Sequence, residues 1–318
     1  MKIVITDGFA VNPGDLSWDI LNQFGSVEIY DDTPNQLAAQ RIADADIAII
    51  NKTKIDEPLL ASCPNLKLIC VAATGYNVVD CDAAAKRGIP VCNVPGYGTN
   101  AVAQFTFSLL LELCNRVGLH DSLVHEGQWS RRTGFCFWET PQMELAGKTM
   151  GIIGFGSIGQ AVGRIAQAFG MEVLACNRSK SPEGEKIGRY VELEELLASS
   201  DIVSLHCPYT PQTHELINES TICKMKDGAI LLNTARGGVI NEQAVAHGLK
   251  TGKLRGAAVD VVSREPITED NPLLSAPNCI ITPHMAWAPL ESRQRIIDSI
   301  VKSIRGFLNG TPVNAVNV

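Results

Sequence analysis

The sequence predicts an α/β protein of two doubly wound domains, each a parallel sheet with helices on both faces. Its 318 residues exceed what one ordinary α/β domain needs. The middle of the chain alternates short apolar runs with helical patterns, and the first hundred residues repeat this alternation on a smaller scale. Strands that alternate with helices pair in parallel and are covered on both faces.

The first hundred residues contain five short apolar runs that we expect to be strands, at 2–6, 26–30, 47–51, 68–72 and 91–93. A glycine-rich segment then leads into a long apolar helix expected over 101–117, which we take as the crossover between domains. Residues 291–308 carry their apolar side chains on one helical face. This terminal helix must pack somewhere, and we expect it to return to the first domain.

Six further strands are expected in the second domain, at 150–154, 172–176, 202–206, 229–233, 256–261 and 279–282. Helices are expected from the glycine motif at 154 to about 169, over 193–198 and over 241–250. The last of these has Asn241 as its N-cap and Gly252 after its end. We therefore predict a substrate domain of residues 1–99 plus 286–318 and a dinucleotide-binding domain of residues 100–285.

The net charge of −7 argues against a nucleic-acid partner and against an anionic membrane surface. No stretch is long and apolar enough to span a bilayer, and the start does not resemble a signal peptide. The ten cysteines form no C-x-x-C pair, so we expect buried free thiols in a reducing compartment and no metal. The sequence thus indicates a cytoplasmic location.

A glycine fingerprint, Gly154-x-Gly156-x-x-Gly159, follows an apolar strand and opens a helix. The first glycine permits a tight turn, the second lets the backbone approach a pyrophosphate, and the third lets helix and strand pack closely. An anion then binds the free N–H groups of the helix start, where Ser157 and Ile158 lie. This setting predicts a dinucleotide site, NAD(H) or NADP(H).

An acidic residue normally accepts the ribose hydroxyls about twenty residues further on. Here the second strand ends in Asn177-Arg178-Ser179, and that acid is missing. Asn177 does not repel a 2′-phosphate, and Arg178 and Ser179 are able to bind one. We therefore favour NADP or dual use over the alternative, in which Arg178 lies over the adenine of NAD.

Three ionisable residues follow the ends of neighbouring apolar strands: Arg236, Glu265 and His284. Open α/β sheets bind ligands at the carboxyl ends of their strands. The planar fork of arginine suits a carboxylate, an imidazole moves a proton, and a glutamate bonded to the other ring nitrogen favours the imidazolium. Among the other histidines only His206, which ends a strand, competes with His284. These parts suit hydride transfer between 2-keto and 2-hydroxy acids.

Four motifs resemble those of the D-isomer-specific 2-hydroxyacid dehydrogenase family: the Gly-Phe-Gly-Ser-Ile-Gly segment, 201–208, 225–238 and Thr-Pro-His at 282–284. The resemblance runs from about residue 68 to 312. It implies a Rossmann domain and a smaller flavodoxin-like substrate domain with the active site in the cleft between them. It also implies Arg236, Glu265 and His284 as catalytic residues, and a homodimer built largely through the cofactor domain.

The resemblance to this family also implies roles for residues outside the catalytic set. Thr74 and Gly75 resemble the loop whose backbone N–H groups hold the substrate carboxylate. The resemblance also implies cofactor contacts at Thr99, Ile158, Cys207, Thr234 and Asp260, with Asp260 near the carboxamide. Trp287 either caps the substrate pocket or packs between domains, and domain closure is expected to hinge at 95–98 and 286–289.

Within the family, the His-x-Ala-Trp-Ala form around His284 resembles the hydroxypyruvate reductase or glycerate dehydrogenase type, so hydroxypyruvate or glyoxylate is the expected substrate. Two alternatives stay open. One is 3-phosphoglycerate oxidation, with Lys52 and Lys54 as candidate phosphate ligands. The other is a cofactor-sensing binding protein that resembles the C-terminal binding corepressors.

Overall fold

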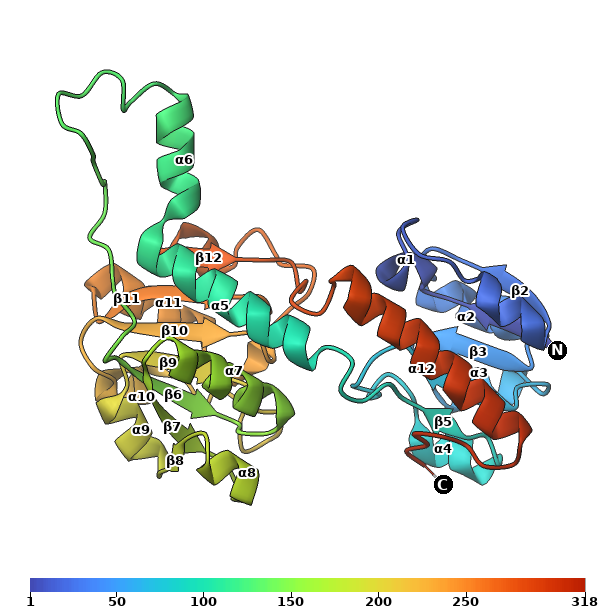
Figure 1. Ribbon diagram of the computed structural model, residues 1–318. Coiled ribbons are helices and arrows are strands. Elements are labelled where there is room, and N and C mark those ends of the chain that lie inside the picture. Colours follow the sequence, from blue (N-terminus) through green and yellow to red (C-terminus); the bar gives the residue numbers. More distant parts are fainter. Residues whose placement is uncertain (318) are drawn as a thin grey trace. The chain divides into compact units, whose positions relative to one another are not determined.

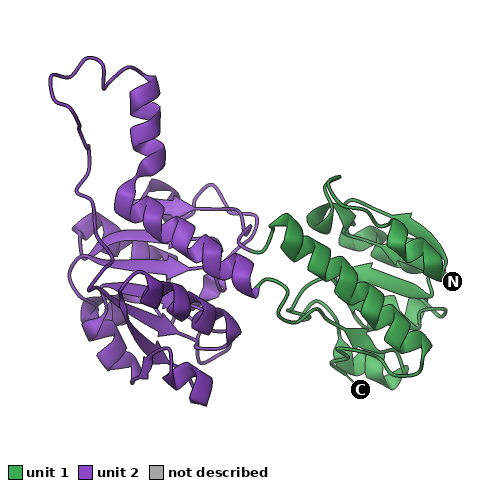
Figure 2. Ribbon diagram, in the orientation of Figure 1, with its two compact units in different colours: residues 1–98, 287–318 green, residues 99–286 purple. Residues whose placement is uncertain are grey.

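The computed structural model describes residues 1–317, which form two compact units (Figures 1 and 2). Unit 1 comprises Met1–Gly98 and Trp287–Val318, and unit 2 comprises Thr99–Ala286. Among the described residues, no helix is long and apolar enough to cross a membrane. Each unit is a parallel α/β sheet covered by helices, which confirms the predicted fold class.

Unit 1 has a five-stranded parallel sheet in the order β2-β1-β3-β4-β5. Its strands are β1 (Lys2–Ile5), β2 (Ser26–Ile29), β3 (Ile47–Ile50), β4 (Leu68–Val71) and β5 (Val91–Cys92). The helices are α1 (Gly8–Val11), η1 (Asp19–Phe24), α2 (Asn35–Ile42), α3 (Glu57–Ser62), α4 (Cys81–Lys86) and α12 (Leu290–Leu308).

Alternate side chains of these strands enter two separate cores. Val4 and Ala48 pack with α2, α3 and α4 on one face, whereas Ile3 and Ile47 pack with α1, η1 and α12 on the other. The side chains at 296, 297, 300, 301 and 304 of α12 are buried in this second core. The terminal helix therefore belongs to the first domain, as its one-sided apolar pattern predicts.

Unit 2 has a seven-stranded parallel sheet in the order β12-β11-β10-β9-β6-β7-β8. Its strands are β6 (Thr149–Ile153), β7 (Glu172–Cys176), β8 (Arg189–Tyr190), β9 (Ile202–Leu205), β10 (Ala229–Asn233), β11 (Leu254–Val259) and β12 (Cys279–Ile281). The strand order reverses between β6 and β9. Such a switch point is where open α/β sheets bind their ligands.

Two helical layers cover this sheet. Helices α5 (Thr99–Asn115) and α7 (Ser157–Ala168) pack on one face. The other face is covered by α9 (Leu193–Ser199), α10 (Glu219–Lys224) and α11 (Glu242–Thr251). As predicted, Asn241 caps α11, and Gly252 ends it in the left-handed conformation. The shorter elements are α6 (Val117–His125), α8 (Pro182–Glu185), η2 (Gly237–Val239) and η3 (Pro272–Ser275).

The prediction of one helix over 101–117 is wrong at its end. Arg116 takes a left-handed conformation, φ 51°, which stops α5 at Asn115 and starts α6 at Val117. The apolar pattern continues through this break and therefore conceals it. Figure 1 shows α6 and the following segment projecting from the rest of unit 2.

The cysteine prediction holds in part. All ten cysteines are free thiols, but Cys136 and Cys223 are exposed, and Cys81, Cys176 and Cys279 are only partly buried. No cluster of three or more His, Cys, Asp or Glu side chains able to hold a metal ion occurs in the described part of the chain.

Candidate active site

The glycine fingerprint lies at the switch point, between the end of β6 and the start of α7. Gly154 has φ +90°, and a Cβ there would meet the backbone of His206 and Cys207. A Cβ on Gly159 would meet the Gly154 carbonyl oxygen. These two glycines allow the turn and the close helix–strand contact that the fingerprint predicts.

Gly156 differs from the other two, because a Cβ built on it meets nothing within 4 Å. It occupies the N-cap position of α7, and no side chain caps this helix end. Space therefore lies open in front of the N–H groups of the first turn, which includes Ser157 and Ile158. This is the cradle that a pyrophosphate needs, and the residues present fit a dinucleotide.

Asn177 holds the fingerprint loop from the end of the neighbouring strand. Its Oδ1 accepts a hydrogen bond from the Phe155 N–H at 3.2 Å, and its Nδ2 donates to the Ser179 carbonyl at 2.8 Å. Asn177, Arg178 and Ser179 are all exposed beside the loop. The position that usually carries a ribose-binding acid thus carries an amide with a structural role and an exposed cation next to it.

The other predicted cofactor contacts also lie in unit 2. Thr99 begins α5, Cys207 follows β9 and is buried, and Thr234 follows β10, with its hydroxyl 3.0 Å from that of Thr106. Asp260 follows β11. Because β9, β10 and β11 are adjacent and parallel, the residues that follow them share one sheet edge.

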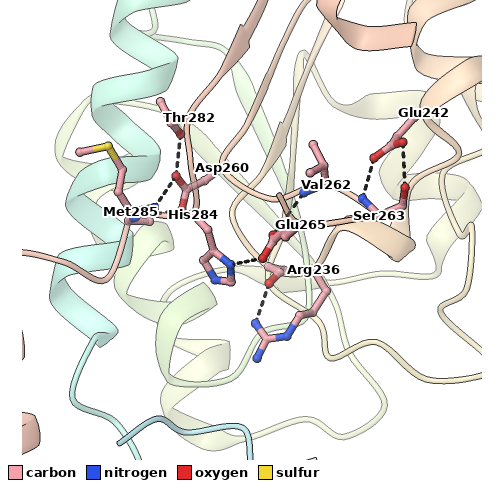
Figure 3. Close-up of polar contacts among 11 residues, drawn as sticks. Arg236, Glu242, Asp260, Val262, Ser263, Glu265, Thr282, His284 and Met285 are labelled. Atoms are coloured by element: carbon pink, nitrogen blue, oxygen red, sulfur yellow. Dashed lines mark hydrogen bonds and ion pairs between the residues drawn. The ribbon is translucent and has the colours of Figure 1, made fainter. Parts of the chain in front are cut away.

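Asp260 is 1% exposed and binds the turn that carries His284. Its carboxylate accepts hydrogen bonds from the Thr282 hydroxyl at 2.6 Å and from the N–H groups of Met285 and Ala286 at 2.9 and 2.8 Å (Figure 3). Burial raises the pKa of this carboxyl, although the hydrogen bonds oppose that shift. The sequence predicts a cofactor contact here, and the structure adds the support of this turn.

His284 and Glu265 form a direct pair. Nδ1 of His284 lies 2.7 Å from Oε2 of Glu265, and both side chains are about one third exposed (Figure 3). The backbone of His284 is left-handed, φ 53°, and its N–H donates to the Asp260 carbonyl at 2.8 Å. Such a conformation in a non-glycine residue is uncommon and clusters at functional sites. The glutamate binds the ring through Nδ1 and thereby fixes the orientation of the imidazole.

Arg236 is exposed at the same edge, three residues after β10. The side chain of the buried Asn233 holds its turn: Nδ2 donates to the Arg236 carbonyl at 3.0 Å, and Oδ1 accepts from the Ala235 N–H at 3.1 Å. A Cβ on Gly237 would meet the backbone of Val262, so the arginine turn packs directly on the loop that carries Glu265. Sequence reasoning missed this role of Asn233, although its partners lie only two and three residues further along the chain, the spacing of an Asx turn.

His206, the competing histidine, is unsuited to proton donation. Its Nε2 lies 2.8 Å from the Ser204 hydroxyl, while Nδ1 is buried and has no hydrogen-bond partner among residues 1–317. Burial lowers the pKa of His206 to about 3. The ring is therefore neutral at neutral pH.

The remaining predicted residues lie in unit 1. Thr74 follows β4, its hydroxyl donates to the Val94 carbonyl at 2.9 Å, and its carbonyl accepts from Asn93 at 2.7 Å, which orders the loop up to Gly75. Trp287 packs edge to face on Tyr97 with ring centroids 6.2 Å apart. Lys54 pairs with Asp56 at 3.5 Å, whereas Lys52 is exposed after β3.

The fold and the site together define a dinucleotide-dependent α/β protein with an imidazole–carboxylate pair at its ligand edge. A family model, the NAD-binding domain of D-isomer-specific 2-hydroxyacid dehydrogenases, matches residues 107–286. The chain belongs to this family. It is thus an oxidoreductase that acts on CH–OH donors.

Two curated relatives and one solved structure show the breadth of the likeness. The chain is 52% identical to a hydroxypyruvate reductase of Blautia hydrogenotrophica, over all of both chains. It is 40% identical to a glycerate dehydrogenase of Methylorubrum extorquens, over 89% of each. An acyclic imino acid reductase (Bsp5) in complex with NADPH and D-Arg is 31% identical with a TM-score of 0.85, over 99% of this chain and 100% of that one.

Proposed function

We propose that this enzyme reduces hydroxypyruvate or glyoxylate to the corresponding D-2-hydroxy acid, with Arg236, Glu265 and His284 as its catalytic residues. The His284–Glu265 pair at 2.7 Å carries the proposal, because it supplies a proton donor at the ligand edge of a dinucleotide domain. The 52% identity to a hydroxypyruvate reductase favours the substrate class.

In this proposal His284 begins as imidazolium and donates its Nε2 proton to the substrate's keto oxygen. When bound, the reduced nicotinamide supplies the hydride for C2. Arg236 binds the substrate carboxylate and polarises the keto group, and Glu265 keeps the imidazole oriented while the proton is transferred. The open cradle at Gly156 and the N-terminus of α7 hold the pyrophosphate.

We further assign unit 1 as the substrate domain. Its loop at Thr74 and Gly75 then offers backbone N–H groups to the substrate carboxylate, and Trp287 limits the size of the substrate. Unit 2 is the cofactor domain in this assignment, with Asn177, Arg178 and Ser179 favouring NADP or dual use.

We also propose a homodimer built through unit 2. Four large apolar side chains of α6 and the segment after it are half exposed or more: Val117, Trp129, Phe135 and Trp138. Large apolar side chains that are exposed along one projecting segment are candidates for an association surface. Sedimentation equilibrium tests the proposal, and a monomer at micromolar concentration contradicts it.

Initial rates with hydroxypyruvate, glyoxylate, pyruvate and 3-phosphohydroxypyruvate, each with NADH and NADPH, test the function. We expect the highest kcat/KM with hydroxypyruvate or glyoxylate. A preference for the phosphorylated substrate would support the phosphoglycerate alternative and a role for Lys52. Inactivity with the whole panel would contradict the proposed substrate class.

A further inference from the structure

Glu242 lies outside the predicted site, yet its carboxylate binds the loop that carries Glu265. Oε1 accepts a hydrogen bond from the Ser263 N–H at 2.7 Å, and Oε2 accepts from the Ser263 hydroxyl at 2.9 Å (Figure 3). Oε2 also accepts from Nδ2 of Asn271 at 3.0 Å. Three donors from both ends of one loop thus converge on a single carboxylate.

These bonds are not needed to start the helix on which Glu242 lies. Asn241 is the N-cap of α11, and its side chain accepts from the Ala244 N–H at 2.8 Å. The Glu242 carboxylate turns instead towards residues 21 and 29 positions further along the chain. A first-turn acid that merely favours the helix dipole has no need of such partners.

The bound loop runs from Asp260, after β11, to Asn271, before η3. Within it the Val262 N–H lies 3.4 Å from Oε1 of Glu265, a long contact between residues on either side of Ser263. Glu265 then reaches His284 with its other oxygen, Oε2. The restrained backbone at Ser263 therefore lies two residues from the carboxylate that orients the imidazole.

The same glutamate is linked to the arginine turn. Arg236 and Glu242 are joined by the short segment that contains η2, and Gly237 in that segment packs on the Val262 backbone. One end of the segment carries the cation, and the other carries the carboxylate that holds the Glu265 loop. Both ends of this segment thus contact the same loop, one through Gly237 and the other through the Glu242 carboxylate.

We propose that Glu242 is a positioning residue: by holding Ser263 and Asn271 it fixes Glu265 against His284 and in register with Arg236. The inference rests on the proposed function for its catalytic consequence. Geometric errors of about 1 Å at a catalytic group cost about 100-fold in rate. Loss of this restraint therefore lowers kcat. Glu242, Ser263 and Asn271 are not among the predicted cofactor contacts, so the affinity for the cofactor should not change.

Glu242→Gln is the first test. The amide retains one acceptor for the Ser263 N–H but presents an NH2 group to the NH2 of Asn271. Asn271 cannot turn its oxygen round, because that atom accepts from the Leu273 N–H at 3.0 Å. We expect kcat to fall about 10- to 100-fold, with the dissociation constant for reduced cofactor, measured by fluorescence, unchanged. Glu269→Gln is the matched control, since it removes an exposed carboxylate from the same loop.

Glu242→Gln combined with Asn271→Asp provides the rescue. The exchanged pair restores a hydrogen bond with donor and acceptor reversed, and an aspartate at 271 still accepts from Leu273. We expect kcat to recover most of its loss. A folded double variant with no recovery overturns the inference, as does a single variant with the wild-type kcat.

A spectroscopic measurement separates this inference from the proposed function. The ring ¹H–¹⁵N signals of His284, assigned by their loss in His284→Asn, should change in Glu242→Gln in the same direction as in Glu265→Gln. This result supports the positioning role whether or not a substrate has been found. Wild-type His284 signals in folded Glu242→Gln overturn it. Inactivity of the wild-type enzyme on the substrate panel, with the signals changed as expected, contradicts only the proposed function.

Discussion

The Asp260 carboxylate accepts a hydrogen bond from the Ala286 N–H at 2.8 Å, at the last residue of unit 2. With Thr282 and Met285 as further donors, this buried group holds the whole turn around His284. Asp260→Asn replaces one acceptor oxygen with an NH2 group that faces backbone donors. We expect the free energy of unfolding to fall by about 1–3 kcal/mol and kcat to fall about 10-fold or more. Urea unfolding and steady-state rates test this, and an unaltered kcat would show that the turn does not depend on Asp260.

The histidine–glutamate pair makes two separable predictions. His284→Asn suits the left-handed backbone at this position, so it should fold and lose about 10²- to 10⁴-fold in kcat. Glu265→Gln removes the carboxylate that holds Nδ1 of His284, so the ring should be less firmly oriented and kcat should fall about 10-fold or more. An unchanged kcat in the first variant excludes His284 as the proton donor, and an unchanged kcat in the second excludes the orienting role of Glu265.

The glycine fingerprint offers a matched pair of substitutions. A Cβ at Gly156 meets nothing in the protein, so Gly156→Ala should keep its thermal midpoint and bind reduced cofactor about 10-fold or more weakly, because the methyl group enters the pyrophosphate cradle. Gly159→Ala drives its Cβ into the Gly154 carbonyl and should lower the thermal midpoint as well. Thermal denaturation and fluorescence titration distinguish the two. Wild-type affinity in Gly156→Ala would place the cofactor elsewhere.

Cofactor choice should depend on the side chain at 177. Asn177→Asp keeps the acceptor for the Phe155 N–H and adds a charge that binds ribose hydroxyls and repels a 2′-phosphate. We expect the ratio of kcat/KM for NADH to that for NADPH to rise about 10-fold, equivalent to about 1.4 kcal/mol. Arg178→Ala should also raise this ratio, because it should weaken the binding of NADPH. If both variants have the wild-type ratio, residues 177–179 do not distinguish the 2′-hydroxyl of NADH from the 2′-phosphate of NADPH.

His206 should make the protein sensitive to acid. Its pKa is lowered from 6.5 to about 3 in the fold, so the unfolded chain binds the proton first as pH falls. The contribution of the neutral, buried ring to the free energy of unfolding is complete above pH 6.5. It is lost as pH falls from 6.5 towards 3, by about 1.4 kcal/mol per pH unit. Between pH 7 and pH 4, the free energy of unfolding of the wild type should therefore fall by about 2–3 kcal/mol more than that of His206→Asn. The exposed His247→Asn serves as control. Equal slopes for the His206 variant and the wild type would contradict the burial argument.

Apart from β8, whose two residues Arg189 and Tyr190 form no apolar run, the strands could be predicted because they are short apolar runs between turn residues. Their alternation with helices indicated the parallel sheets. Arg236, Glu265 and His284 could be expected at one edge because each follows the end of a strand, and β10, β11 and β12 prove to be neighbours. Periodicity could not reveal the break at Arg116, since the apolar pattern continues across it and the nearest glycine, Gly118, lies in the first turn of α6.

Other parts of the site were beyond sequence reasoning for a physical reason. The roles of Glu242 and Asp260 depend on hydrogen bonds that join distant segments, such as Glu242 to Ser263. A polar residue at a strand end or in a first helical turn has many ordinary explanations in sequence. Only the folded backbone shows which donors converge on it.

The position of α12 has a consequence for biosynthesis. Its buried isoleucines complete one of the two cores of unit 1, so that core lacks a wall until the ribosome has made residue 308. Unit 2 consists entirely of residues that emerge earlier, up to Ala286. Domains usually fold in the order in which they are translated. Here unit 1 begins first but is completed last. The nascent chain must therefore keep the incomplete sheet of unit 1 from aggregating while unit 2 is made.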